Sequence, residues 1–224
     1  MSTIDVASVA TALAELRERI RRAGGGQDVA VLPVTKAFGP DAVEAAIAAG
    51  CTSVGENYAQ ELLAKRAALE RVEVHFIGQL QTNKVRQIAD LVGVYETVDR
   101  PKLAREIAKR APGARVYIQV DTSGDPGKGG CPIGDLDPLV DVVGGLDLSL
   151  EGLMTVGPTH GGPEAARDGF RSVRAAVDRL GLATCSMGMT ADLEVAVQEG
   201  STQVRVGTAL FGPRPVHNWR EQER

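Results

Sequence analysis

The segment Val29–Asn57, "VAVLPVTKAFGPDAVEAAIAAGCTSVGEN", contains the patterns of a strand, a helix and a second strand in succession. Its apolar, β-branched beginning predicts a buried strand over residues 29–35. In the stretch that follows, Pro40 suits the first position of a helix and Gly50 suits its end. A second β-branched run predicts another strand over residues 52–55. This order is typical of parallel strands joined by helical crossovers.

The same alternation continues through the rest of the chain. Further strands are predicted near residues 73–77, 93–98, 115–120, 148–154, 183–186 and 202–206. About eight strand–helix repeats without a linker-like segment predict a closed α/β barrel, the (β/α)8 barrel of the TIM type. A doubly wound open sheet is the alternative, and repeats of comparable length favour the barrel. We expect a single domain over residues 1–224.

An extra helix is predicted before the first strand, over about residues 3–23, where glycines end it. Apolar residues recur there at helical spacing, namely Val6, Val9, Leu13, Leu16 and Ile20. The tail at about residues 213–224, "PRPVHNWREQER", carries no interpretable motif. The helix therefore adds one amphipathic element to the predicted barrel.

Composition excludes several classes of protein. The chain is 43% hydrophobic and 24% charged, as is usual for globular proteins, and its net charge of -4 argues against nucleic acid as a partner. No apolar run is long enough for a signal peptide or a membrane span. Cys51, Cys131 and Cys185 are widely spaced, which disfavours disulfides and zinc. We therefore expect a cytoplasmic protein that binds no membrane and no metal.

Polar residues follow several of the predicted strands, and chemistry in such barrels collects at the carboxyl ends of the strands. Lys36 follows the first strand and Asn57 follows the second. The last two strands end in "SMGMT" (Ser186–Thr190) and "RVGT" (Arg205–Thr208). We therefore expect these groups to converge on one rim of the barrel.

The last two of these segments have the chemistry of a phosphate site. Thr190 is a potential N-cap ahead of an amphipathic helix, whose first amide groups attract anions. Gly207 allows close approach of the backbone, and the Thr208 hydroxyl is a donor. A Ser or Thr at a helix start is more often only a cap. Two such segments on adjacent strands of a barrel nevertheless make phosphate contacts a reasonable hypothesis.

Lys36 is the candidate nucleophile. Partial burial at the mouth of the barrel disfavours the charged form of the amine and frees it for attack. A nearby cation such as Arg205 acts in the same direction. An amine beside a phosphate site suggests a Schiff base with a phosphorylated aldehyde. The alternative is a lysine that extends into solvent, or one that pairs with Glu56 or Asp121.

Several other residues have structural interpretations. His75 lies within a predicted strand and is expected to be a hydrogen-bonded core residue, because no partner spacing indicates a metal site or a triad. Asn57 and Gln60 have the spacing of a capping box. Cys131, in the Gly- and Pro-rich segment 121–135, is expected to be a surface cysteine.

The chain resembles the pyridoxal phosphate homeostasis protein family, the proline-synthase co-transcribed type, in five motifs: "VTKAFG", "VGENYAQEL", "HFIGQLQTNK", "GLMTV" and "SMGMTADLEVAVQEGSTQVRVGTALFG". The resemblance covers nearly the whole chain between the first helix and Gly212. It implies a barrel similar to the N-terminal domain of alanine racemase, which is pyridoxal phosphate fold type III. It also implies that pyridoxal 5'-phosphate is held as an aldimine on Lys36.

The resemblance further implies roles for the rim residues. Phosphate contacts are implied for Ser186, Gly188, Gly207 and Thr208. Asn57 is implied to lie beside the cofactor, and Arg205 to face the pyridine nitrogen. Thr190 stands where the family more often has serine, keeps the hydroxyl and is a further cofactor-binding candidate. Because an arginine does not give up its proton in practice, it leaves that nitrogen unprotonated and weakens carbanion chemistry.

We interpret the chain as a cytoplasmic, monomeric carrier of pyridoxal phosphate, with the apo-enzymes that use this cofactor as partners and with no catalytic residue of its own. The alternative is a small amino-acid racemase. Racemases of similar fold take their second base from a tyrosine of a β-rich domain, which is not expected because the chain ends soon after its last motif. Tyr58, Tyr95 and Tyr117 offer no clear substitute. A barrel that binds no cofactor is the third possibility.

Overall fold

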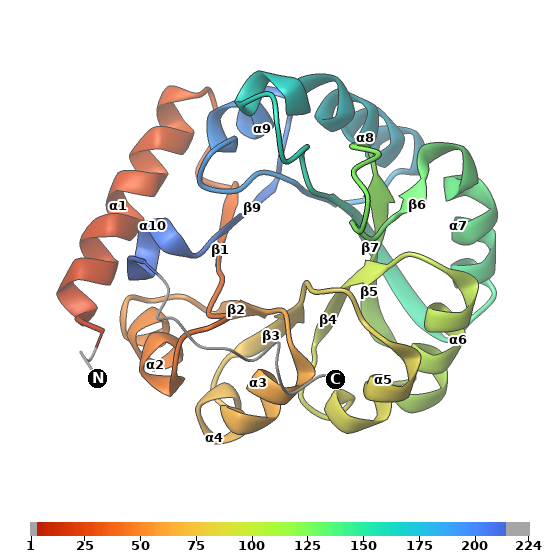
Figure 1. The fold of residues 1–224 in the computed structure, drawn as a ribbon, viewed down its shortest axis with the longest axis horizontal. Helices are drawn as coiled ribbons and strands as arrows, with labels where there is room; N and C mark the ends of the chain where they lie inside the picture. The colour runs from red at the N-terminus through yellow and green to blue at the C-terminus, as the bar shows by residue number, and fades with distance from the viewer. Residues whose placement is uncertain (1–3, 214–224) are drawn as a thin grey trace.

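The computed structural model describes residues 4–213; residues 1–3 and the tail 214–224, which includes His217, lie outside the described residues. In this described range, eight parallel strands form a barrel wall that helices surround (Figure 1). These strands are β1 (Ala30–Pro33), β2 (Ser53–Glu56), β3 (Glu73–Phe76), β4 (Val94–Val98), β5 (Ala114–Asp121), β7 (Leu148–Thr155), β8 (Thr184–Ser186) and β9 (Gln203–Val206).

A short strand, β6 (Cys131–Pro132), pairs with β5. It buries Cys131 to 4% exposure, so the expectation of a surface cysteine is wrong.

The strands follow one another around the barrel in the order β1, β9, β8, β7, β5, β4, β3, β2. The two ends of this series meet between β1 and β2, where Val34 bridges Gly55 in parallel. There the Thr35 N–H donates a hydrogen bond of 3.0 Å to the Gly55 carbonyl. The parallel barrel is therefore nearly closed, as predicted, and the doubly wound open sheet is wrong.

Helices cover the outside of the barrel. They are α1 (Val6–Arg22), α2 (Pro40–Ala48), α3 (Ala59–Ala64), α4 (Arg66–Leu69), α5 (Thr82–Ile88), α6 (Pro101–Arg110), α7 (Leu136–Gly144), α8 (Arg167–Leu180), α9 (Leu193–Gln198) and α10 (Thr208–Phe211). Pro40 begins α2 as predicted, because its fixed φ suits the first helical turn. Within residues 4–213, none of these helices is long and apolar enough to cross a membrane.

The N-terminal helix α1 packs beside α2 and α10 on the outside of the barrel (Figure 1). Asp5 caps it by accepting a hydrogen bond of 2.8 Å from the Ser8 N–H. Its apolar face joins α9, β9 and α10 in one cluster, which contains Leu13, Leu16, Ile20, Leu193, Val197, Val204, Val206 and Leu210. The predicted amphipathic helix is confirmed, except that Val6 is 42% exposed.

Polar and charged side chains are buried on the strands or directly after them. They include Thr35, Glu56, His75, Glu96, Gln119, Thr155, Ser186, Gln203 and Arg205. Glu96 of β4 accepts a hydrogen bond of 2.7 Å from Ser186 of β8, and these strands are not neighbours in the sheet. These side chains therefore meet across the barrel interior. Branched apolar residues usually fill that space, so its polar content needs a specific arrangement.

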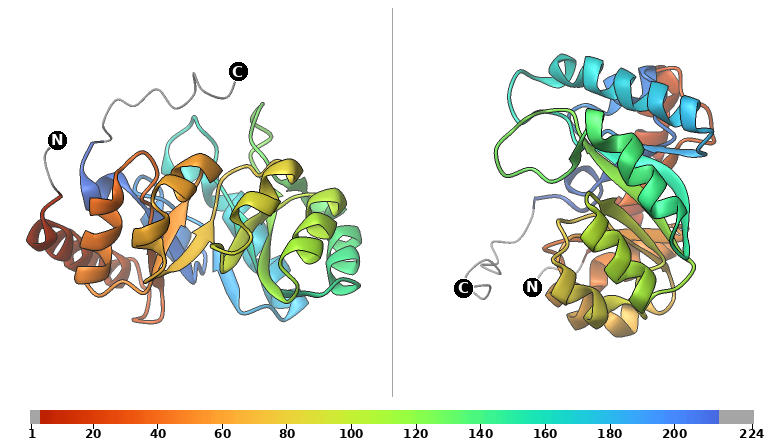
Figure 2. Two further views of the ribbon diagram at one scale, coloured as in Figure 1. Left: turned by 90° about the horizontal axis from the view of Figure 1, so that it is seen from below. Right: turned by 90° about the vertical axis from the view of Figure 1, so that its right-hand side faces the viewer.

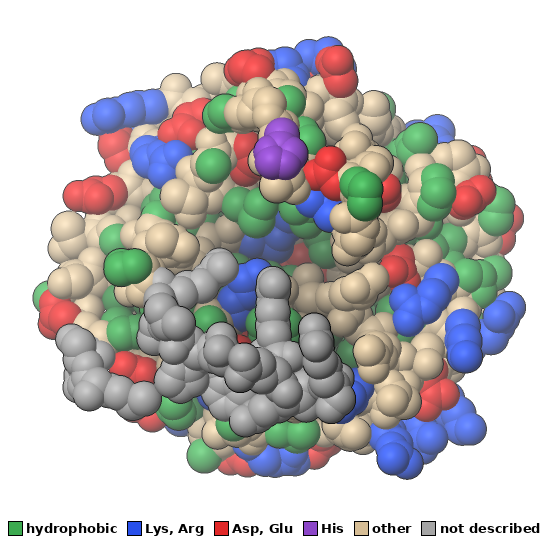
Figure 3. Space-filling view, in the orientation of Figure 1, with side chains coloured by type: hydrophobic (Ala, Val, Ile, Leu, Met, Phe, Trp, Pro, Cys, Tyr) green, Lys and Arg blue, Asp and Glu red, His purple; other side chains and the backbone are tan. Residues whose placement is uncertain are grey.

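The loops after β5 and β7 rise from one face of the barrel, at the carboxyl ends of the strands (Figure 2). They are joined there, because the Thr159 N–H donates to Asp125 Oδ2 at 2.8 Å and Lys128 Nζ donates to the Gly157 carbonyl at 2.6 Å. This face is hollowed near its centre, and Lys or Arg side chains are visible in the hollow (Figure 3). We call this hollowed face the mouth of the barrel.

Candidate cofactor site at the mouth of the barrel

The candidate residues lie along one arc of the mouth. In ring order the arc contains β2, β1, β9 and β8, which are neighbours in the barrel. The residues are placed as follows: Asn57 after β2, Lys36 after β1, Arg205 in β9, Ser186 in β8, Gly188 and Thr190 in the loop after β8, and Gly207 and Thr208 at the start of α10. Because parallel strands end at the same edge of a sheet, the fold brings this set together.

Lys36 lies where the barrel closes and is half-buried. The two carboxylates considered as its alternative partners have other contacts. Glu56 accepts a hydrogen bond of 2.8 Å from Lys65 Nζ, deep beneath the rim. Asp121 Oδ1 accepts from the N–H groups of Ser123 and Gly124 at 2.9 and 3.0 Å and so shapes the loop after β5. Both carboxylates therefore have structural roles of their own.

Gly188 forms the turn between β8 and α9. Its φ of 94° lies in the left-handed region, and a Cβ there would lie 2.4 Å from the Ala196 Cβ. The position therefore requires glycine for the backbone turn and for packing against α9. The Gly188 carbonyl accepts a hydrogen bond of 2.9 Å from the Arg205 N–H, which joins this turn to β9.

The segment after β9 presents backbone donors to the mouth. Gly207 is buried and precedes α10, and Thr208 is the exposed first residue of that helix. The N–H groups of the first helical residues have no acceptor within their own helix, so they are available to an anion. This arrangement suits the phosphate contact that was predicted for these two residues.

Thr190 is not the N-cap of α9, so that expectation is wrong. The cap is Asp192, which also accepts a hydrogen bond of 2.6 Å from the Met189 N–H. The helix begins later than predicted because this local turn takes up the intervening residues. The Thr190 carbonyl accepts a hydrogen bond of 3.0 Å from Arg19 of α1. Thr190 itself is half-buried beside the Gly188 turn.

Asn57 lies at the mouth but does not cap α3. The N-cap of α3 is Tyr58, and no side chain caps this helix, so the predicted capping box of Asn57 and Gln60 is wrong. The Asn57 backbone packs tightly on Gly78, where a Cβ would lie 2.1 Å from the Asn57 carbonyl oxygen. Asn57 Oδ1 is buried without a hydrogen-bond partner among the described residues. That oxygen is therefore available to a donor on a ligand.

Arg205 extends beneath the ends of β7 and β8. One terminal nitrogen donates to the Ser186 carbonyl and hydroxyl, each at 2.8 Å, and the other donates to the Thr155 carbonyl at 2.7 Å. Burial lowers the pKa of Arg205, whereas Glu96 and Asp192 raise it. A guanidinium in this setting still keeps its proton at neutral pH. Arg205 is 4% exposed and is thus a fixed, buried cation.

The Ser186 hydroxyl is fully occupied within the protein. It donates to Glu96 Oε2 at 2.7 Å, and it accepts from Arg205 at 2.8 Å and from Gln203 Nε2 at 3.1 Å. A hydroxyl has one proton to donate, and here Glu96 receives it. Ser186 is 0% exposed. Its side chain is therefore arranged to support Arg205, and the predicted phosphate contact would fall to other groups of the loop.

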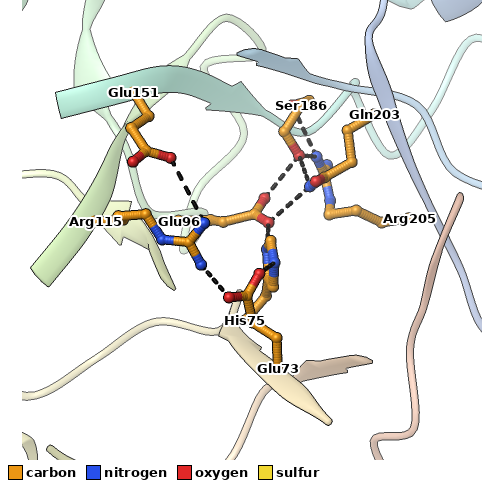
Figure 4. Close-up of polar contacts among 8 residues, drawn as sticks. All are labelled: Glu73, His75, Glu96, Arg115, Glu151, Ser186, Gln203 and Arg205. Atoms are coloured by element: carbon orange, nitrogen blue, oxygen red, sulfur yellow. Dashed lines mark hydrogen bonds and ion pairs between the residues drawn. The ribbon is translucent and has the colours of Figure 1, made fainter. Parts of the chain in front are cut away.

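Glu96 is at the centre of a network that crosses the barrel interior (Figure 4). Its Oε1 lies 2.6 Å from His75 Nδ1 and accepts from Gln203 Nε2 at 2.7 Å. Burial raises the pKa of Glu96, but His75, Arg205 and Ser186 together outweigh this effect, so the pKa of Glu96 is lowered overall. Glu96 is therefore a buried anion that is linked to Arg205 through the Ser186 hydroxyl.

The network continues from His75 to the opposite end of the barrel. His75 Nε2 lies 3.3 Å from Glu73 Oε2, and Glu73 also pairs with Arg115. The Arg115 guanidinium in turn lies 4.0 Å from Glu151 (Figure 4). His75 is 5% exposed, so the prediction of a hydrogen-bonded core histidine is confirmed.

Glu96 and Gln203 were missed by sequence reasoning, and so was the structural role of Ser186. The available signal for Glu96 is its position inside "VYETV", where a carboxylate interrupts an otherwise apolar strand. A carboxylate buried in this way must be paired or hydrogen-bonded. No local spacing identifies its partners, because they come from other strands: His75 from the neighbouring β3, and Ser186 and Gln203 from β8 and β9 across the barrel.

Comparison with known sequences gives consistent matches. The sequence profile of the alanine racemase N-terminal domain family matches residues 4–215. A pyridoxal phosphate homeostasis protein of Pseudomonas aeruginosa is 41% identical, with 96% of this chain and 97% of that protein aligned. A protein of the same name from Aquifex aeolicus is 38% identical, with 90% of this chain and 95% of that protein aligned.

Solved structures agree with these matches. PipY of Synechococcus elongatus, in a structure with PLP bound, is 30% identical with a TM-score of 0.79, covering 91% of this chain and all (100%) of that one. An alanine racemase of Clostridium difficile is 14% identical with a TM-score of 0.71, covers 92% of this chain and 58% of that one, and shares the fold.

The barrel is that of the proteins built on the alanine racemase N-terminal domain, which is pyridoxal phosphate fold type III. Within this class, the chain belongs to the pyridoxal phosphate homeostasis protein family.

We expect Glu96→Gln to lower the free energy of unfolding by about 3 kcal/mol at neutral pH, because it removes the buried carboxylate that contributes most to offsetting the charge of Arg205. The lowered pKa of Glu96 means that its contribution is complete above the ordinary value of 4.5 and is lost as the pH falls through the folded-state value. Urea denaturation followed by circular dichroism should therefore show a difference between variant and unaltered protein that shrinks below about pH 4.5.

Glu151→Gln is the control for this measurement, since Glu151 belongs to the partly exposed end of the same network. It should change the free energy of unfolding by less than about 0.5 kcal/mol. Equal effects of the two substitutions, or a Glu96 effect that does not vary with pH, would contradict the assignment of Glu96 as the buried counter-ion.

Proposed function

We propose that this protein binds pyridoxal 5'-phosphate at the mouth of the barrel and acts in the intracellular homeostasis of that cofactor. The observation that carries the proposal is the fixed, buried Arg205 cation on the same arc of the mouth as Lys36 and the start of α10. The relatives are named for this role, and PipY has been solved with PLP bound.

The residues of the mouth fit the parts of this cofactor. Bound pyridoxal phosphate supplies an aldehyde that a primary amine attacks reversibly, and a phosphate that N–H groups can hold. Among the described residues, Arg205 uses only three of its five N–H donors, which leaves two for a ligand. The amides of Gly207 and Thr208 can hold an anion, and Asn57 Oδ1 accepts a hydrogen bond. Lys36 supplies the amine.

Arg205 also bears on the choice between carrier and enzyme. If it faces the ring nitrogen, it donates a hydrogen bond without giving up its proton, so the ring remains a weak electron sink. Racemisation passes through a carbanion, which a weaker electron sink stabilises less. The environment of Arg205 therefore favours a protein that holds the cofactor over one that uses it in catalysis.

Three of the candidate bases, Tyr95, Tyr117 and His75, are poorly placed for racemisation. Tyr95 and Tyr117 are 0% and 4% exposed, and burial raises the pKa of both phenols, that of Tyr117 to about 12. His75 is held between Glu73 and Glu96 inside the barrel. A racemase needs a base on each face of the substrate. We therefore propose a non-catalytic carrier that acts as a cytoplasmic monomer and passes its cofactor to apo-enzymes.

Lys36→Ala should abolish covalent capture of pyridoxal phosphate while the protein stays folded, because Lys36 is half-buried at the rim and not in the core. Borohydride makes the link between an amine and the cofactor permanent, and peptide mass spectrometry then locates it. Lys84→Ala, which alters a lysine of α5, should leave the labelling of Lys36 unchanged. Labelling of a different lysine in the unaltered protein would contradict the proposed attachment.

Arg205→Gln should weaken cofactor binding by about 10- to 100-fold, since it removes a charge-assisted hydrogen bond. Ser186→Ala should weaken it by only about fivefold, because Ser186 acts by orienting Arg205. The double variant should then bind about as well as Arg205→Gln alone. Equilibrium dialysis measures these affinities. Independent, multiplicative losses would show that Ser186 contacts the cofactor by itself.

A carrier should reactivate an apo-enzyme without acting on amino acids. The cofactor-loaded protein is expected to restore the activity of a pyridoxal phosphate-dependent apo-enzyme, and Lys36→Ala should do so less well. A chiral assay under the same conditions should detect no conversion of alanine, serine or glutamate. Appearance of D-amino acid that depends on Lys36 would instead establish the racemase.

A further inference from the structure

A buried ionic cluster, formed by Glu56, Glu61 and Lys65, lies beneath the rim next to Lys36, and no step of the proposed function uses it. Glu56 ends β2, and the other two residues come from α3 and its C-terminal end. The three side chains are 0%, 2% and 4% exposed. Lys65 Nζ lies 2.8 Å from Glu56 Oε1 and 3.5 Å from Glu61 Oε2. Burying such a group is unfavourable in itself, so its contacts need an explanation.

The cluster binds the residue that precedes Lys36. Lys65 Nζ donates a hydrogen bond of 2.7 Å to the Thr35 carbonyl, which belongs to the peptide group shared with Lys36. The Thr35 hydroxyl donates to Glu56 Oε1 at 2.5 Å. Thr35 is 0% exposed. Both the backbone and the side chain on this flank of Lys36 are therefore held.

The cluster also binds the residue that follows Lys36. The Ala37 N–H donates a hydrogen bond of 2.7 Å to Glu61 Oε2. Ala37 has a φ of 65°, and among the described residues it is the one non-glycine residue with a positive φ. The left-handed conformation costs such a residue about 1–2 kcal/mol, so it persists only where the surroundings hold it. Glu61 supplies that hold at the turn after Lys36.

The charged groups of the cluster are compatible with holding the backbone on both sides of Lys36. Burial raises the pKa of Glu56, and the opposing effects of Lys65 and Thr35 do not cancel the rise. Lys65 lies within ion-pair distance of both carboxylates, so the cluster contains a positive charge beside its acidic groups. Glu56 Oε2 and Glu61 Oε1 have no hydrogen-bond partner among the described residues, and the other oxygens of these carboxylates make the contacts to Thr35, Ala37 and Lys65.

We propose that Glu61, together with Glu56 and Lys65, is a positioning group that fixes the backbone on both sides of Lys36 and so directs its amine toward the aldehyde of pyridoxal phosphate. The inference rests on the proposed function, since it assumes that Lys36 is the attachment residue. Glu61 touches neither the cofactor nor the reacting atoms in this proposal. It acts through the turn at Ala37.

The reach of residue 61 should decide how fast Lys36 captures the cofactor. Glu61→Asp keeps the carboxylate but is one methylene too short to hold the Ala37 N–H, and it should slow the capture about tenfold. Glu61→Gln loses the charge but keeps an acceptor at the same reach, and it should restore a rate near that of the unaltered protein. The measurement is borohydride trapping at increasing times, with mass spectrometry of the Lys36 peptide.

Leu139→Ala is the control for lost stability. Leu139 is buried in α7, which packs against β5 and β7 and away from the arc of candidate residues. It should lower the free energy of unfolding by about 2–5 kcal/mol without changing the capture rate under folding conditions. A slower rate in this control would show that capture follows stability, and it would overturn the positioning role.

Other outcomes also decide the proposal. Capture by Glu61→Asp at the unaltered rate would overturn it, and so would a Glu61→Gln variant as slow as Glu61→Asp. If Glu61→Asp does not fold, Thr35→Val tests the other flank of Lys36. Loss of the hydroxyl bond to Glu56 should also slow capture. An unchanged capture rate in Thr35→Val would overturn the positioning role. Absence of label on Lys36 in the unaltered protein would instead overturn the proposed function and this inference with it.

Discussion

The opposite charges of Glu96 and Arg205, buried on different sides of the barrel interior, are the constraint on which much of this structure depends. Neither charge is stable alone in a space that solvent does not enter. The Ser186 hydroxyl connects the two by hydrogen bonds, Gln203 donates to both Glu96 and Ser186, and His75 supports Glu96 from β3. Strands from four parts of the sequence must therefore be in register before the network forms, which ties the closure of the barrel to the geometry of its mouth.

A second buried ionic group repeats this arrangement farther along the same arc of the mouth, at β2 and α3. Glu56, Glu61 and Lys65 hold the turn that carries Lys36, as Glu96 and Ser186 hold Arg205. In each case the residue expected to meet the ligand is placed by charged side chains that the ligand does not reach. Under the proposed function, the protein would therefore meet its cofactor with both groups already oriented, which lowers the entropy lost on binding.

Periodicity and punctuation in the sequence are enough to predict the strands, the first helix and the nearly closed barrel, because these depend on local patterns and on the rule that parallel strands need crossovers. The same rule predicts that Lys36 and Arg205 share one end of the barrel. It does not predict that the Ser186 hydroxyl is bound to Glu96, since the two residues meet only across the finished barrel. The helix caps expected at Asn57 and Thr190 also fail, because α3 begins after Tyr58 and α9 begins after Asp192, slightly farther along the chain in each case.

The way in which the barrel uses its titratable groups argues for a holding function. Catalysis at a carbon atom requires groups that exchange protons at the substrate, and these must be close to it and free to change their charge. Here His75 is held between two carboxylates, Tyr95 and Tyr117 are sealed in the core, and Arg205 does not release its proton. The interior charges are committed to orienting the mouth, so reversible attachment through Lys36 is the chemistry that this arrangement best supports.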